Sequence, residues 1–110
     1  LNPEKLNILS SELIGTHDFT SFSKINTEVQ NKVCNIYEAR WRRQKNLFIF
    51  YIEANRFLYG MVRAIVGSLL KAYSLDDGIG YLKNLITQKD RSQAADAVPA
   101  KGLFLYKVKY

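Results

Sequence analysis

Apolar residues recur every three or four positions in three stretches of the chain, and this spacing predicts three helices. The first is expected over residues 3–14, where leucines form a stripe, an Asn-Pro pair suits the helix start and Gly15 suits its end. The second is expected over residues 57–74, where apolar positions cover about half of the helical wheel. A third helix of about ten residues is expected after the Asp-Asp-Gly sequence at 76–78.

Dense runs of aromatic and β-branched residues predict three strands. The strongest is LFIFYIEA at 47–54. Its core-facing side would present Phe48, Phe50, Ile52 and Ala54. A second strand, over about residues 32–43, would join it through a polar turn at 43–46 to form a hairpin. The third strand closes the chain as LFLYKVKY at 103–110.

Two shorter segments lack a long periodic pattern. In the first, residues 16–24, Asp18 is expected to cap a single turn that buries Phe19 and Phe22. In the second, residues 89–97, one or two helical turns are expected before a proline breaks the helix.

This order of elements predicts an α+β fold, with helices packed on one face of an antiparallel sheet. The chain shows no internal repeat, low-complexity tract or linker. Residues 1–110 are therefore expected to form a single domain.

Composition and charge narrow the class of protein. The chain has 110 residues, of which 47% are hydrophobic, enough for a folded core. Its formal charge of +6 favours a polyanionic partner, for which nucleic acid is the usual candidate. The single cysteine, Cys34, and the lack of a signal peptide or membrane-length apolar run indicate a cytoplasmic protein. Since the chain begins at Leu1 and not at methionine, it is expected to be processed or to be a piece of a longer protein.

Arg63 is the first candidate site residue. It lies just past the edge of the apolar face of the helix expected at 57–74, between Gly60 and Gly67. A glycine within a helix costs about 0.5–1 kcal/mol relative to alanine, so two of them predict a close approach by a backbone or a ligand. The competing and commoner arrangement is an arginine whose side chain extends from the helix edge to water.

Two further stretches are candidate RNA-binding surfaces. Around Trp41, the hairpin has four basic residues, a mixture suited to phosphate contacts and base stacking. These residues are Arg40, Arg42, Arg43 and Lys45. In the closing strand, Leu103, Leu105, Lys107 and Lys109 alternate with core-type residues and would form the floor of a nucleic-acid cleft. For both stretches an ordinary solvated surface remains the alternative.

The sequence contains no complete set of catalytic residues. His17 and Asp18 are adjacent, but a turn residue followed by a helix cap explains them better than an acid–base pair. With one histidine and one cysteine, no metal site is expected. There is also no phosphate-binding glycine loop and no Ser-His-Asp set.

Three segments together resemble the A-type family of tRNA pseudouridine synthases. GTHDFTSF at 15–22 resembles a motif of glycine followed by His-Asp-Phe, and NRFLYGMVRAIVGSLL at 55–70 resembles the signature around an arginine. RSQAADAVPAKGLFL at 91–105 resembles the closing motif of the family. Where the family often has a small residue, this chain has Arg56, which becomes a candidate phosphate ligand.

The resemblance implies an enzyme built from two similar halves, of which this chain is the C-terminal one. The nucleophilic aspartate of the family lies in an Arg-Thr-Asp motif in the other half, and this chain has no such motif. Arg63 would pair with that aspartate, and Leu103 would pack in the uridine pocket. The resemblance implies no cofactor. Its partners would be tRNA, the missing half and, as a candidate assembly, a second copy in a homodimer.

The expected function is therefore part of an enzyme that isomerises uridine to pseudouridine in the anticodon stem-loop of tRNA, with residues 1–110 inactive alone. A free-standing, non-catalytic RNA-binding module is the first alternative. A protein-interaction domain that uses the leucine-rich first helix is the second.

Overall fold

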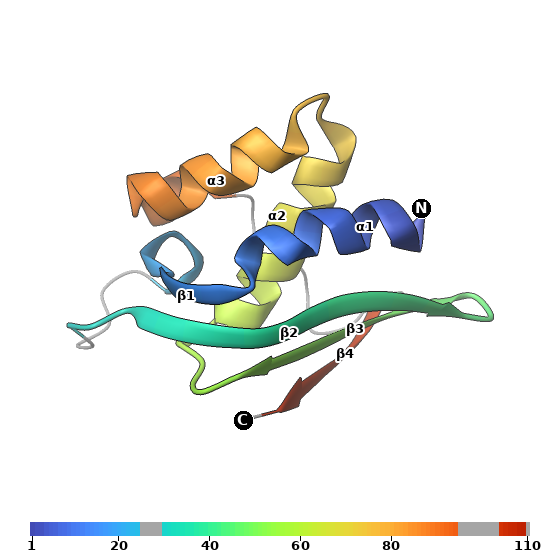
Figure 1. The fold of residues 1–110 in the computed structure, drawn as a ribbon, viewed down its shortest axis with the longest axis horizontal. Helices are drawn as coiled ribbons and strands as arrows, with labels where there is room; N and C mark the ends of the chain where they lie inside the picture. The colour runs from blue at the N-terminus through green and yellow to red at the C-terminus, as the bar shows by residue number, and fades with distance from the viewer. Residues whose placement is uncertain (25–29, 95–103, 110) are drawn as a thin grey trace.

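In the part of the chain that the structure describes, three helices lie on one side of a four-stranded sheet (Figure 1). The computed structural model describes residues 1–24 and 30–94 and the backbone of 104–109. In chain order, the helices and strands are α1 (Pro3–Ser10), β1 (Gly15–Asp18), β2 (Val33–Gln44), β3 (Leu47–Ala54), α2 (Met61–Ser74), α3 (Gly78–Gln88) and β4 (Phe104–Lys109). Short 3₁₀ turns occupy Ser11–Leu13, Thr20–Phe22 and Arg91–Gln93. The predicted α+β class, with helices on one face, is confirmed.

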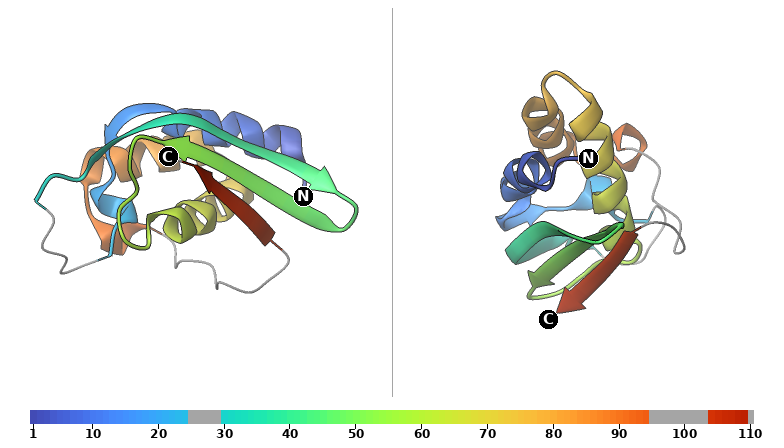
Figure 2. Two further views of the ribbon diagram at one scale, coloured as in Figure 1. Left: turned by 90° about the horizontal axis from the view of Figure 1, so that it is seen from below. Right: turned by 90° about the vertical axis from the view of Figure 1, so that its right-hand side faces the viewer.

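The strands lie in the order β1-β2-β3-β4. The first three pair antiparallel, and β2 and β3 form the predicted hairpin around a turn at Lys45 and Asn46. The last strand pairs parallel to β3, which makes the sheet mixed. Helices α2 and α3 form the connection between these two strands, and such a crossover is what a parallel pair requires. Figure 2 shows β4 at the edge of the sheet beside β3.

Strand β1 was not expected, because four residues of mixed exposure present no clear alternation. It begins at Gly15, whose φ of +110° lies in the left-handed region. Its partner is the start of β2, with Gly15 opposite Ile36 and His17 opposite Cys34. His17 is therefore a strand residue and not the turn residue predicted, and its Nε2 lies 3.0 Å from the carbonyl oxygen of Ile14.

Helix α1 starts as predicted. The side chain of Asn2 accepts a hydrogen bond from the amide of Glu4, and a proline follows the cap. The leucines of this region, Leu6, Leu9 and Leu13, are at most 4% exposed and face the core. They are consequently unavailable as the protein-contact surface considered above.

The core lies between the helical layer and the sheet. From β3 it receives the predicted face, in which Phe50, Ile52 and Ala54 are buried and Phe48 is partly buried. The helices contribute Met61, Ile65 and Leu69 from α2 and Leu82 and Leu85 from α3. Both the wide apolar face of α2 and the inward face of α3 are thus confirmed.

The turn at Thr20–Phe22 has the predicted cap. One Asp18 carboxylate oxygen accepts hydrogen bonds from the Thr20 amide at 2.9 Å and from the Thr20 hydroxyl. Phe19 and Phe22 are fully buried beside it. Partial burial alone would raise the pKa of Asp18, but the two bonds from Thr20, with Lys89 and Lys32 nearby, lower it overall.

Replacing Asp18 with alanine is expected to lower the free energy of unfolding by about 1 kcal/mol near pH 6, because the cap is lost. A carboxylate whose pKa is lowered by folding stabilises the fold above its unfolded pKa of about 4 and loses this effect as the pH falls through the folded value. The difference between wild type and variant in urea unfolding should therefore shrink at about pH 2.5. If the difference in free energy of unfolding between wild type and variant stayed constant over this pH range, the ionised Asp18 carboxylate would not be the stabilising form.

Candidate functional site

The segment between β3 and α2 determines where Arg63 lies. The predicted helix at 57–74 begins only at Met61, because Gly60 adopts a left-handed conformation with φ of +74°. An L side chain is strained there by roughly 1–2 kcal/mol, which gives Gly60 its own reason to be glycine. The expectation of two glycines inside the helix is therefore wrong for Gly60, whereas Gly67 lies within α2 and is buried. Arg63 falls in the first turn of the helix.

Hydrogen bonds to neighbouring segments hold this connection. The backbone N–H of Asn55 donates to the backbone carbonyl of Asn35 at 3.1 Å. In return, Oδ1 of Asn55 accepts from the backbone N–H of Asn35 at 2.8 Å. Further along, the Lys24 amide donates to the Tyr59 carbonyl at 3.0 Å, and the Lys24 ammonium lies 4.8 Å from the Tyr59 ring centre. The start of α2 is thus tied to β2 and to the segment after the Thr20–Phe22 turn.

Arg56 also belongs to this set of contacts. Its Nη1 donates to the backbone carbonyls of Asn31 at 3.0 Å and Val33 at 3.2 Å. These bonds attach the loop to the start of β2, a structural role that the sequence did not suggest. Its part in phosphate binding stays a prediction.

The structure describes only one of the two residues assigned to the uridine site. Arg63 is partly exposed, which is compatible both with the predicted contact to a carboxylate and with a side chain that extends to water. Leu103 lies outside the described residues. The pairing of Arg63 and the packing of Leu103 therefore both stay predictions.

Successive side chains of β2 point to opposite faces of the sheet, so the residues of the basic hairpin do not share one face. Arg40 and Arg42 are exposed, whereas Trp41 is 3% exposed and points into the core. The Trp41 ring nitrogen donates to the Ser10 hydroxyl at 3.0 Å, and its ring centre lies 4.9 Å from that of Phe50. The interpretation of Trp41 as an aromatic that stacks on RNA between basic residues is wrong, because the strand places it on the opposite face.

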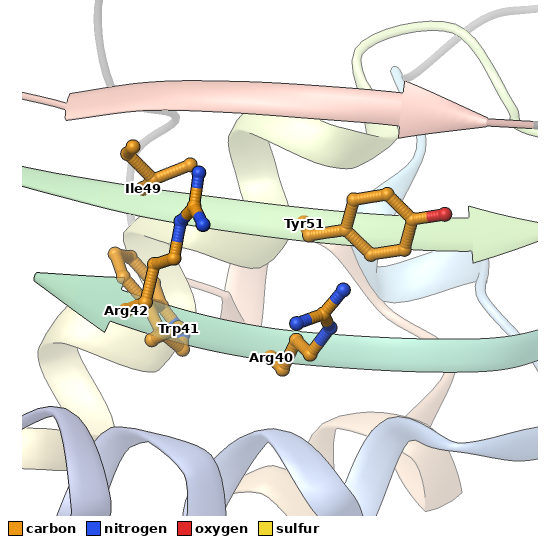
Figure 3. A pocket seen from close by; sticks show the side chains of 5 residues that line it. All are labelled: Arg40, Trp41, Arg42, Ile49 and Tyr51. Carbon is orange, nitrogen blue, oxygen red and sulfur yellow. The ribbon is translucent and has the colours of Figure 1, made fainter.

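A hollow of about 230 Å³ opens on the sheet beside Arg40 and Arg42 (Figure 3). Its lining residues are Arg40, Trp41, Arg42, Ile49 and Tyr51. The hairpin register pairs Arg40 with Tyr51 and Arg42 with Ile49, so the two arginines and their partners come from adjacent strands. The side chain of Arg42 extends across the hairpin toward Ile49 in Figure 3. This face is the one that the helices leave uncovered.

A chain of polar contacts holds one wall of the hollow in place. Arg40 Nε lies 2.5 Å from a carboxylate oxygen of Glu38, and its guanidinium carbon lies 4.9 Å from the Tyr51 ring centre. The Tyr51 hydroxyl donates to Glu53 at 2.9 Å, a bond that raises the pKa of Tyr51. The strong strand was predicted from the sequence, but the role of Tyr51 was not. The register of the hairpin could have shown that Tyr51 lies opposite Arg40, because this register follows once the turn at residues 45–46 is recognised.

The other predicted basic residues occupy two further places. Arg43 and Lys45 are exposed at the hairpin end, where Arg43 Nε donates to the Lys45 carbonyl at 3.1 Å. In β4, the backbone pairs Lys107 with Tyr51 and Lys109 with Glu53. Arg40 and Arg42 therefore belong to β2 and the two lysines to β4, the strands on either side of β3, while Arg63 belongs to the helical layer.

The described residues contain no helix with the length and apolar character to cross a bilayer. A profile described as tRNA pseudouridine synthase matches residues 9–110. The chain is 42% identical over 110 residues to the tRNA pseudouridine synthase A of Clostridium acetobutylicum and to that of Parabacteroides distasonis. It is also 42% identical over 115 aligned positions to the tRNA pseudouridine synthase A of Bacillus subtilis. In each case all of this chain is covered, but only 45%, 44% and 44% of the relative, so it spans less than half their length.

Proposed function

The chain belongs to the tRNA pseudouridine synthase family, and the resemblance noted from its three motifs is confirmed. We propose that it is the C-terminal part of such an enzyme. The complete enzyme would isomerise uridine to pseudouridine in the anticodon stem-loop of tRNA, in the cytoplasm. Its partners would be tRNA, the half that bears the aspartate and, in a homodimer, a second copy.

The observation that carries this proposal is the placement of Arg63. It lies in the first turn of α2, directly after the left-handed Gly60, in a connection that Asn55 ties to β2. A guanidinium held at a fixed position can form two parallel hydrogen bonds to a carboxylate. Such a neighbour favours the ionised carboxylate and lowers its pKa. This supports Arg63 as the residue that orients an aspartate supplied by the other half.

The proposed chemistry needs an ionised aspartate. Its carboxylate would attack the uridine or its sugar as the glycosidic bond from the sugar to the ring nitrogen breaks. The uracil would then turn and rejoin the sugar through a ring carbon. Reactant and product are isomers, so no external cofactor is needed. Leu103 would pack against the base, and the exposed basic residues would bind the RNA backbone.

A free-standing RNA-binding module would use the same basic residues without any reaction. The interaction-domain alternative is less well supported, because the leucines of the first helix are buried. Binding of tRNA through several phosphates should weaken steeply with salt, whereas an apolar protein contact should not.

Residues 1–110 alone are expected to form no pseudouridine in a tRNA transcript, because the nucleophile is in the other half. Co-expression with the N-terminal half of the Clostridium acetobutylicum relative, whose C-terminal half this chain would replace, is expected to restore formation. Carbodiimide modification followed by primer extension detects the product base. As a control, the supplied half should carry asparagine in place of its aspartate in a parallel reaction. Product formed by residues 1–110 alone would overturn the proposal.

A further inference from the structure

We propose that the hollow on the uncovered face of the sheet binds one unstacked nucleotide of the RNA, with its base against Tyr51 and its phosphate at Arg42. This inference rests on the proposed function, because it takes RNA as the ligand. Arg63 lies in the helical layer, whereas the hollow lies on the opposite face of the sheet.

The first argument is the chemistry of the lining. The hollow combines an aromatic ring, an aliphatic floor at Ile49 and two guanidinium groups within about 230 Å³. Aromatic side chains on an open sheet that are flanked by cations are typical of proteins that bind single-stranded RNA. A fully apolar ligand would leave the charge of Arg42 unused, and a free anion would leave the ring unused. A nucleotide satisfies both.

The second argument is that the Tyr51 ring is already held in position. Arg40 lies over its face, with a distance of 4.9 Å from the guanidinium carbon to the ring centre, and Glu53 accepts its hydroxyl hydrogen bond at 2.9 Å. Glu38 in turn holds Arg40. A ring that is ordered before binding loses less side-chain entropy on binding, which favours affinity.

The third argument is the charge of Arg42. Arg40 has a carboxylate partner, but among the described residues Arg42 has no ion-pair or hydrogen-bond partner. Its side chain reaches across the hollow toward Ile49 (Figure 3). Arg42 could therefore bind a phosphate without breaking an existing ion pair.

The test measures binding of a fluorescein-labelled hexauridylate to the chain of 110 residues by fluorescence anisotropy. Replacing Tyr51 with leucine should weaken binding about tenfold, the size expected for one lost base stack. Tyr51→Phe keeps the ring and loses only the hydroxyl bond to Glu53, so it should weaken binding much less than Tyr51→Leu. Arg42→Gln should also weaken binding, and the slope of log affinity against log salt should fall by about 0.7, the single-strand value for one phosphate.

Three controls keep the result interpretable. Arg43→Gln removes a charge at the hairpin end, outside the hollow, and should have a smaller effect than Arg42→Gln. Urea unfolding verifies that each variant is folded. A fully paired RNA duplex with the same label should be insensitive to Tyr51→Leu, since its bases are not free to enter.

Unchanged hexauridylate affinity in folded Tyr51→Leu would overturn this inference, as would equal affinity for hexaglutamate, which would indicate an unspecific polyanion surface. The proposed function would survive both results if the two halves together still form pseudouridine. Conversely, Tyr51-dependent binding without any pseudouridine formation by the two halves would support the hollow and overturn the proposed enzyme.

Discussion

Replacing Arg63 with alanine in the complete two-half enzyme is expected to lower kcat/KM for pseudouridine formation by about 100- to 5,000-fold. Removing one partner of a buried ion pair costs about 3–5 kcal/mol, and each 1.36 kcal/mol corresponds to a factor of ten in rate. Without the guanidinium, the pKa of the aspartate should rise. The residual activity should therefore shift toward higher pH, which a pH–rate profile would measure.

Two variants sharpen this test. Arg63→Lys keeps the charge but loses the planar pair of donors, so its activity should fall between those of wild type and Arg63→Ala. Lys71, an exposed basic residue in the last turn of the same helix, provides the control, and Lys71→Ala should leave the rate unchanged. Near-normal turnover in folded Arg63→Ala would refute the assigned role.

Replacing Trp41 with alanine is expected to lower the free energy of unfolding by about 3–5 kcal/mol, the usual effect of removing a large buried aromatic side chain. Trp41 is 3% exposed, packs on Phe50 and donates to Ser10. Trp41→Phe should cost less, about 1–3 kcal/mol, because most of the packing is kept and one buried hydrogen bond is lost. Urea unfolding monitored by circular dichroism measures both values.

The same variants separate a core role from an RNA contact. Folded Trp41→Phe should weaken hexauridylate binding much less than Tyr51→Leu, because Trp41 is 3% exposed and contributes little surface to the hollow that it helps to line. Arg42→Gln is the matched control on that face, and its free energy of unfolding should change by less than about 0.5 kcal/mol. Weaker RNA binding by folded Trp41→Phe, at unchanged stability, would contradict the structural role.

Elements with a local pattern could be predicted from the sequence. The leucine stripe and the Asn-Pro start determined α1, and the dense run at 47–54 determined β3 and its buried face. The Asp18 cap was also readable, because a cap depends on residues two or three positions apart. The three motifs were sufficient to identify the family, since a motif is a fixed order of residues and can be recognised without any knowledge of the fold.

Features that depend on contacts between distant segments could not be predicted and became evident in the folded chain. The apolar residues before Gly60 continue the pattern of the helix, yet the left-handed glycine and the bonds to β2 exclude them from α2. The parallel pairing of β4 depends on the path of the connecting helices, and the short β1 depends on its neighbour. Likewise, it is the register of the hairpin that sets Tyr51 opposite Arg40 in the lining of the hollow. Periodicity records which face of one segment is buried, whereas a binding site requires the relative positions of several.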